Sequence, residues 1–300
     1  MVEKKTQISV EETDSIKMNL KSDENGSVIS AEVKLPKTHD FEFAHDVDYI
    51  VHCASPTASS YFADHPVETY NSVFFPSYHL LQYATRHDVK GFVYLSSLEV
   101  YGIVTDNGEP LVEETLGYVD LTSPRSSYPL AKRAVEHLCA LYAHEYGVPV
   151  SVARLTQTTG AGVPWKDNRV INAFCRSAVL GEDIVLHTTG ESARPYCHLD
   201  DVLRAILVLL KNGEKGETYN VANESIFISA YDLALFIKNH LNPDINVKME
   251  LKKDVPYAPP TRIRMSTAKL LALGWTPQYG LEEICCDVFN YYKHLYTHAK

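Results

Sequence analysis

The sequence predicts an α/β fold built on a doubly wound parallel sheet, and two observations support this class. From residue 47 onward, short apolar runs alternate with longer segments of helical periodicity. Polar side chains follow three of the apolar runs, at Ser55, Ser97 and Gln157. The carboxyl ends of parallel strands are where α/β proteins place their sites, so polar residues are expected there. The 300 residues suffice for one large domain or two closely joined ones.

Residues 1–45 differ from the rest of the chain, because they are polar and hold only one long alternating segment, residues 27–35. The alternation predicts a strand that pairs with residues 16–20 as a hairpin across a turn at 24–26. A partly disordered leader is the alternative, since so polar a segment offers little apolar surface to bury.

Residues 46–165 are predicted to form the core of the fold. The pattern predicts strands over residues 47–55, 91–97 and 148–155, and helices over residues 66–87 and 128–146. The strands are apolar at nearly every position, which is typical of strands that are buried on both faces of a parallel sheet. We therefore expect helices on both faces.

Residues 166–300 are less regular and are predicted to form a smaller lobe interleaved with the core. The expected elements are helices over residues 168–180, 203–210, 230–240 and 281–295 and strands over residues 183–187 and 217–221. Neither an internal repeat nor a low-complexity linker marks a clean boundary between the two parts.

Composition narrows the function classes. The formal net charge of −10 argues against a general nucleic-acid binder. The six cysteines form no Cys-x-x-Cys pair and no metal-site spacing with histidine, so no metal is expected. The N-terminus has no apolar signal-peptide region, and no apolar run of about 18 residues is present. We expect a cytoplasmic protein that binds no membrane.

Tyr128 and Lys132 are the first candidates for chemistry. They are four residues apart on a predicted helix, so they lie on one face, one turn apart. Both side chains ionise near pH ~10, but an ammonium beside a phenol stabilises the phenolate and lowers the pKa of the tyrosine. Such a tyrosine can act as a general base or acid. The nearby predicted strand that ends in Ser96 and Ser97 makes this pair more specific than its spacing alone.

Three polar residues are expected to be structural instead. His52 lies on a predicted buried strand, and His198 lies next to an aspartate pair; buried histidines are usually held by hydrogen bonds and are not catalysts. Asp201, the second aspartate of that pair, is expected to cap a helix.

About residues 47–290 resemble the extended short-chain dehydrogenase/reductases that act on nucleotide sugars, a family of epimerases, dehydratases and decarboxylases. The motifs follow the family's order: the strand 47–55, Ser-Ser-x-Glu-Val-Tyr-Gly at 96–102, Tyr128-x-x-x-Lys132, Arg-x-x-Gln-x-x-Gly at 154–160, Gly190-x-x-x-Arg194, His198-x-Asp200-Asp201, Tyr219-Asn220-Val221 and Leu273-Gly274-Trp275-x-Pro277. The resemblance implies a Rossmann-like sheet, N-terminally truncated or altered, with a small interleaved C-terminal substrate lobe.

The resemblance also implies roles for individual residues. Tyr128 would exchange a proton with a sugar hydroxyl while NAD exchanges hydride with its carbon, Lys132 would hold the nicotinamide ribose, and Ser97 would orient the sugar oxygen. The implied catalytic set is Tyr128, Lys132, Ser97 and Glu99. The implied NAD-binding residues are Cys53, Ala54, Ser55, Ser96, Tyr128, Lys132 and Leu155. The implied contacts of a UDP- or dTDP-sugar are Ser97, Leu98, Gln157, Arg194 and Arg264, with Arg194 gripping the diphosphate.

Leu98 and Glu99 bear on the type of reaction. Family dehydratases carry an Asp-Glu pair at these positions, which serves as the acid and base of water elimination. Leu98 cannot donate a proton, so the resemblance favours decarboxylase-like or epimerase-like chemistry over dehydration. The alternative for Glu99 is that it only bonds a nearby backbone or hydroxyl group.

The family's N-terminal glycine-rich turn, which receives the pyrophosphate of the cofactor, has no counterpart here, since Gly26 is the only glycine before Gly91. Three interpretations stay open: a fragment or mis-started version of a longer enzyme, NAD binding through the nicotinamide half alone, or a degenerate non-catalytic member that binds a sugar nucleotide or a partner chain.

A homodimer through the helix of Tyr128 is also implied by the resemblance. An apolar stripe on this helix could equally face a dimer partner or the core; it consists of Val135, Leu138, Cys139 and Tyr142.

Overall fold

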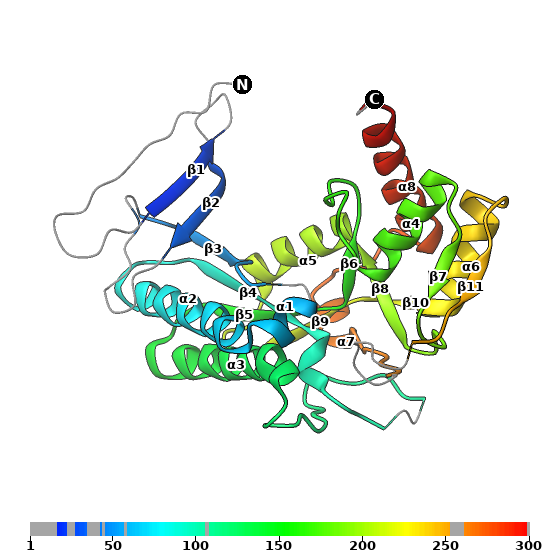
Figure 1. The fold of residues 1–300 in the computed structure, drawn as a ribbon. Helices are drawn as coiled ribbons and strands as arrows, with labels where there is room; N and C mark the ends of the chain where they lie inside the picture. Colours follow the sequence, from blue (N-terminus) through cyan, green and yellow to red (C-terminus); the bar gives the residue numbers. More distant parts are fainter. Residues whose placement is uncertain are drawn as a thin grey trace.

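A parallel four-stranded sheet lies at the centre of the molecule, with strand order β3-β4-β5-β9 (Figure 1). Its strands are β3 (Tyr49–His52), β4 (Gly91–Ser97), β5 (Val150–Leu155) and β9 (Thr218–Val221). The structure is a computed structural model, and it describes residues 17–22, 28–34, 43, 46–56, 59–105, 108–252 and 261–298. The predicted parallel sheet is confirmed, because all three strand pairs run in the same direction.

Helices cover both faces of this sheet, as the doubly wound class requires. α2 (Pro66–Arg86) and α3 (Ser127–Tyr146) pack on one face, where they meet alternate residues of β4 such as Phe92 and Tyr94. α5 (Leu199–Asn212) packs on the other face against Val93, which lies between those two. The alternation follows from the period of two along a strand, and it separates two apolar clusters.

α5 begins at Leu199, four residues before the predicted start at residue 203. The side chain of His198 caps the helix, since its Nδ1 accepts a hydrogen bond from the N–H of Asp200. Asp201 is therefore not the cap. This carboxylate is fully buried and accepts hydrogen bonds from the backbone N–H groups of Gln278 and Tyr279, which ties the start of α5 to a distant loop.

A second group of elements surrounds its own apolar cluster. It contains α4 (Val170–Leu180), α6 (Ala230–Leu241) and α8 (Leu281–His298). Its sheets have the orders β10-β8-β6 and β11-β7, with β6 (Gln157–Thr159), β7 (Ile184–Leu186), β8 (Ala193–His198), β10 (Asn223–Ser229) and β11 (Val247–Met249). The predicted domain boundaries at residues 45 and 165 stay a prediction.

Short elements complete the described chain. They are helices α1 (Ser59–Asp64) and α7 (Ala268–Ala272) and 3-10 turns at Leu98–Tyr101 and Pro124–Ser126. Among the described residues, every helix is too short or too polar to cross a membrane.

An antiparallel hairpin lies near the N-terminus, within the segment where the sequence left a hairpin and a disordered leader open. β1 (Lys17–Ser22) pairs with β2 (Val28–Lys34), and the two form a sheet of their own. The register places Met18 opposite Val33 and Leu20 opposite Ala31.

Strand β3 differs from its neighbours in burial. Ile50 and His52 are buried against α2 and α3, whereas Tyr49 and Val51 are 54% and 40% exposed. β3 is also the end strand of the sheet, since in the described part of the chain it pairs with β4 alone.

Candidate active site

The Tyr128 phenol lies at the centre of the candidate site. Tyr128 is the second residue of α3, and its phenol lies beside the hydroxyls of Ser97, at the end of β4, and Ser55, just after β3, which both act to lower its pKa. The Tyr128 side chain is 7% exposed. The carboxyl ends of two adjacent parallel strands and the first turn of a helix thus bring three hydroxyls together, as expected for a site in an α/β sheet.

Lys132 lies one helical turn further along α3 and is almost fully buried. Its Nζ donates a hydrogen bond of 2.7 Å to the backbone oxygen of Leu95 and lies 4.7 Å from the ring centre of Tyr94 and 5.6 Å from that of Tyr128. Burial lowers the pKa of Lys132 to about 8, and the Glu136 carboxylate opposes this shift. The Lys132 ammonium is therefore hydrogen-bonded to the backbone of β4, near the Tyr128 ring.

The pKa of Tyr128 differs from the sequence prediction. Burial raises the pKa of Tyr128 to about 12, and the negative charge of Glu99 adds to the rise. The expected lowering by Lys132 is not seen; the ammonium lies 5.6 Å from the Tyr128 ring centre and donates to the Leu95 carbonyl. Tyr128 is consequently a neutral phenol at pH 7, ready to donate a proton.

Glu99 is held by Arg125, a residue that the sequence reasoning did not single out. One guanidinium nitrogen of Arg125 lies 3.0 and 2.9 Å from the two carboxylate oxygens of Glu99. The Arg125 guanidinium also lies 4.9 Å from the ring centre of Phe62, which stacks on the Tyr128 ring at 4.3 Å and 3°. Glu99 is thus a carboxylate paired with Arg125 next to Tyr128. Only tertiary contacts reveal Arg125 and Phe62, since neither stands out in the sequence.

The two predicted substrate arginines lie in different surroundings. Arg194, on β8, donates a 2.9 Å hydrogen bond to Thr261 and is near enough to Glu99 for that carboxylate to oppose the lowering of its pKa by burial. The Arg264 guanidinium lies 3.7 Å from the ring centre of Phe227, on β10. Arg194 therefore belongs to the surroundings of Glu99, whereas Arg264 is held at the neighbouring sheet.

Three predicted contact residues are placed differently from the rest. Ser96 and Leu98 bond or pack within the protein, and Gln157 lies on a strand of the neighbouring sheet. The Ser96 hydroxyl, 4% exposed, donates a 2.5 Å hydrogen bond to Glu136, so the cofactor contact implied for Ser96 finds no free hydroxyl. Leu98 is 1% exposed and packs in an apolar cluster, so its side chain cannot reach a substrate. Gln157 lies on β6, opposite Tyr196 of β8.

The Glu136 carboxylate organises the interior beneath the site. It is bound by two nitrogens of Arg154 at 3.1 and 2.6 Å and by the Ser96 hydroxyl, and both charged side chains are largely buried. Because Arg154 is on β5 and Ser96 on β4, this carboxylate connects α3 to two strands of the sheet.

His52 is structural, as its sequence position predicts. Its Nε2 lies 2.9 Å from the Ser77 hydroxyl, which itself donates to the backbone oxygen of Val73. The ring therefore donates to Ser77 and is neutral. Burial, with a smaller effect of Lys132, lowers the pKa of His52 to about 3.

The residues at the carboxyl end of β3 fit the nicotinamide end of NAD. Cys53 and Ala54 are exposed there, next to the partly buried Ser55. Leu155 lies opposite Ser97 in the register of β4 and β5. An ammonium has three N–H donors, and Lys132 spends one on Leu95, so two remain for ribose hydroxyls.

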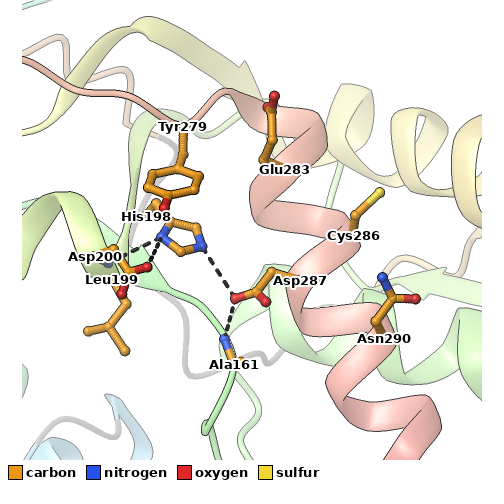
Figure 2. Close-up of a pocket in the computed structure, with 9 residues that line it drawn as sticks. All are labelled: Ala161, His198, Leu199, Asp200, Tyr279, Glu283, Cys286, Asp287 and Asn290. Atoms are coloured by element: carbon orange, nitrogen blue, oxygen red, sulfur yellow. Dashed lines mark hydrogen bonds and ion pairs between the residues drawn. The ribbon is translucent and has the colours of Figure 1, made fainter.

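A cavity of about 490 Å³ lies elsewhere, between the start of α5 and helix α8 (Figure 2). His198 Nε2 lies 3.3 Å from the carboxylate of Asp287, which also accepts a 2.6 Å hydrogen bond from the N–H of Ala161. Tyr279 stacks on the His198 ring at 4.1 Å. None of the predicted site residues lines this cavity, and no cluster of metal-ligand side chains occurs in the described part of the chain. These contacts brace α5 against α8.

Comparison with known proteins places the chain among nucleotide-sugar enzymes. Residues 7–222 match the model of the NAD dependent epimerase/dehydratase family. UDP-glucuronic acid decarboxylase 5 of Arabidopsis thaliana is 29% identical over 238 residues, which are 79% of this chain and 68% of that protein.

Two solved structures share the fold. UDP-glucose 4-epimerase from Thermotoga maritima, solved with UDP-glucose, has a TM-score of 0.74 and 23% identity over 83% of this chain and 78% of its own. RMD from Pseudomonas aeruginosa, complexed with NADPH, has a TM-score of 0.74 and 25% identity over 87% of this chain and 90% of its own.

Proposed function

Because this chain belongs to the NAD dependent epimerase/dehydratase family, we propose that it modifies the sugar ring of a UDP-sugar, with Ser97, Tyr128 and Lys132 as its catalytic set. The observation that carries the proposal is the Tyr128 phenol, buried beside the hydroxyls of Ser97 and Ser55. A buried phenol beside two hydroxyls can pass a proton to or from a third hydroxyl placed against it.

The residues divide the work as follows. Ser97 holds the sugar hydroxyl against the Tyr128 oxygen, and Tyr128 takes or returns the hydroxyl proton. Bound NAD supplies the hydride acceptor and donor for the carbon that carries this hydroxyl. Lys132 anchors the ribose with its two remaining donors, and the positive charge of Arg125 opposes the rise in the pKa of Tyr128 that burial causes.

Decarboxylation of an acidic sugar is the reaction that the site supports best. The charges of Glu99 and Arg125 cancel at about 3 Å, and Arg194 adds a positive charge beside them. A site with net positive charge favours a substrate that carries a carboxylate besides its diphosphate. The similarity to UDP-glucuronic acid decarboxylase 5 supports the same choice.

Product mass tests this proposal. The full chain is incubated with NAD and either UDP-glucuronic acid or UDP-glucose, and the products are analysed by mass spectrometry. We expect a product that has lost the mass of CO₂ from the acidic sugar only. An isomer of unchanged mass would assign epimerisation instead. Loss of water would contradict the inference that Leu98 disfavours dehydration.

A non-catalytic binder of sugar nucleotides is the second candidate. The observation in its favour is the sequence before Gly91, where the only glycine is Gly26 and a glycine-rich phosphate turn is therefore not present. A ligand at ~100 times its dissociation constant adds about 2.7 kcal/mol to the free energy of unfolding. A rise in Tm with a UDP-sugar but none with NAD would favour this candidate over the enzyme.

A homodimer through α2 and α3 is the assembly that we propose. Val135 and Cys139 of the predicted stripe are buried in the core, but the two adjacent helices expose Tyr70, Phe75 and Leu141 at 37%, 48% and 45%. Light scattering of the eluted full chain measures its mass. Leu141→Arg should convert a dimer to a monomer, and a native chain that elutes as a monomer would refute the assembly.

We propose a reducing cytoplasmic compartment for the protein. All six cysteines are free thiols, and four of them are buried, which suits a compartment in which disulfides do not form. Imaging of the tagged full chain tests this location.

A further inference from the structure

Arg125 connects two chain segments that lie next to the Tyr128 phenol. It is the middle residue of the 3-10 turn Pro124–Ser126, which leads directly into α3, where Tyr128 is the second residue. Pro124 fixes the first φ angle of this turn, because its ring locks that dihedral. The backbone of Arg125 is thus held at a constant place relative to Tyr128, three residues further along the chain.

The first of the two segments is the 3-10 turn that follows β4 and carries Glu99. One guanidinium nitrogen of Arg125 donates to both carboxylate oxygens of Glu99, at 3.0 and 2.9 Å, and the two side chains are 24% and 25% exposed. The N–H of Glu99 donates a 3.3 Å hydrogen bond to the Ser97 hydroxyl. By holding Glu99, Arg125 therefore also supports the turn that keeps the Ser97 oxygen beside the phenol.

The second segment is α1, which carries Phe62. The Arg125 guanidinium lies 4.9 Å from the centre of the Phe62 ring, and this ring stacks on that of Tyr128 at 4.3 Å and 3°. Phe62 is 1% exposed, and its backbone oxygen accepts a 3.3 Å hydrogen bond from the Ser127 hydroxyl. A planar guanidinium suits both contacts, because it can bind a carboxylate and lie over an aromatic ring at the same time.

Arg125 also balances the charge beside the phenol. Burial raises the pKa of Tyr128 to about 12, the Glu99 carboxylate adds to this rise, and the Arg125 guanidinium opposes it. A phenol is a better proton acceptor when its pKa lies closer to the working pH, so the guanidinium favours proton transfer. Lys132 and Tyr94 also lie near Tyr128.

We propose that Arg125 is a positioning residue of the proposed reaction, one that holds Glu99 and Phe62 around the Tyr128 phenol and neutralises the carboxylate beside it. The inference rests on the proposed function, because Tyr128 is the residue that exchanges the proton there. Arg125 acts through its two neighbours and keeps its own proton throughout, since a guanidinium stays charged in proteins.

Four variants of the full chain test this role. Arg125→Lys keeps the charge without the planar contact, Arg125→Met removes both, Glu99→Gln removes the negative charge, and the fourth combines Arg125→Met with Glu99→Gln. Arg204→Met is the matched control. Arg204, on α5, also pairs with a carboxylate, that of Asp201, and lies 6.0 Å from the centre of an aromatic ring, that of Tyr279.

Titration of the Tyr128 phenol is the first measurement, and it needs no substrate. NMR of ring-labelled tyrosine follows the phenol, and the absence of its signal from Tyr128→Phe assigns it. At pH 11 about a tenth of the Tyr128 phenols should be ionised in the native protein, because their pKa is about 12. Glu99→Gln should raise this fraction several-fold, Arg125→Met should lower it several-fold, and the double variant should return it close to the native value.

Turnover of UDP-glucuronic acid with NAD is the second measurement. We expect kcat to fall about 10²-fold in Arg125→Met, because a small displacement of a reacting group has an effect of this size. Arg125→Lys should lose about tenfold and keep the native pH dependence of kcat/KM, since its charge is retained. Arg204→Met should lower Tm and leave both measurements unchanged.

A native phenolate fraction and a native kcat in Arg125→Met would overturn the proposal. Equal changes in Arg204→Met would also overturn it, because the effect would then belong to general stability. A double variant that keeps the low phenolate fraction of Arg125→Met would refute the neutralising role. If the native protein turns over no sugar nucleotide, the proposed function fails, and the phenol titration still decides whether Arg125 acts on Tyr128.

Discussion

The two faces of the central sheet differ in which side chains they bury and which they expose. On the face of α2 and α3, polar groups are deeply buried: His52, Tyr128 and Lys132 are 4%, 7% and 3% exposed. On the face of α5, apolar groups at the edge are exposed, with Tyr49 and Val51 as the extreme cases. Strand β3 contributes to both faces by simple alternation of its four residues.

This difference in burial separates the face that holds the candidate active site from the face that exposes apolar side chains. Burial shifts the pKa values of His52, Tyr128 and Lys132 far from their usual ranges, and such shifts are typical of functional sites. The exposed apolar residues of the other face have no comparable chemistry, and their free energy depends on what covers them. The two faces should therefore respond differently to substitution: the buried polar face through activity and pH dependence, and the exposed apolar face through stability alone.

The largest effect is expected at Tyr128. Tyr128→Phe removes the hydroxyl that exchanges the proton but keeps the ring that stacks on Phe62, so kcat should fall by about 10²–10⁴-fold. Steady-state kinetics measures the loss. Binding of the UDP-sugar, followed by calorimetry, should change little. A variant that keeps most of its kcat would remove Tyr128 from the mechanism.

Glu136→Ala should have the next largest effect, on stability. It leaves the Arg154 guanidinium buried without its carboxylate, which costs about 3–5 kcal/mol of the free energy of unfolding. Urea denaturation measures this loss. Asp48→Asn is the matched control, because it breaks an ion pair with Lys90 that is exposed to solvent and should cost far less. Equal losses of the free energy of unfolding in the two variants would show that burial does not strengthen the Glu136–Arg154 ion pair.

Lys132→Met should stabilise the protein in a pH-dependent way. Because burial lowers the pKa of Lys132 from 10.5 to about 8, the folded state pays the full cost of the buried charge below pH 8. The unfolded chain binds more protons between pH 8 and 10.5, so the native protein gains stability as pH rises through this window. The variant should be more stable at pH 7 by up to about 3 kcal/mol, and the difference should shrink towards pH 10.

A stability difference between Lys132→Met and the native protein that stays constant from pH 7 to pH 10 would contradict a buried ammonium. Chemical denaturation at each pH gives the free energy of unfolding.

The smallest effect is expected on the exposed face. Val51→Thr replaces a methyl group with a hydroxyl on β3, where the side chain is 40% exposed, so it should cost less than about 1 kcal/mol of the free energy of unfolding. Urea denaturation measures the cost. A loss as large as that of Glu136→Ala would contradict the difference between the two faces.

The sequence was sufficient for the central elements and insufficient for the contacts between them. The periodicities of β4, α3 and β5 set their bounds to within two residues. The start of α5 is missed because a histidine caps it, and histidine is an uncommon cap. β6, β8 and β10 have mixed polar and apolar residues, so pairing between strands defines them more than local pattern does.

The candidate site shows the same limit. Ser97, Tyr128 and Lys132 could be chosen from their motifs, because strand ends and helical spacing are local properties. Arg125 and Phe62 could not, since their roles depend on where a separate short helix packs. The pKa of Tyr128 was predicted in the wrong direction because spacing indicates proximity to Lys132 but not the depth of burial.

The hydrogen bond from Lys132 to the Leu95 carbonyl has an evolutionary consequence. A main-chain carbonyl is present whatever residue occupies position 95, so no single substitution there removes the acceptor. The orientation of the ammonium is therefore inherited with the backbone of β4. The side chain at position 95 can therefore differ while the acceptor of the lysine is retained.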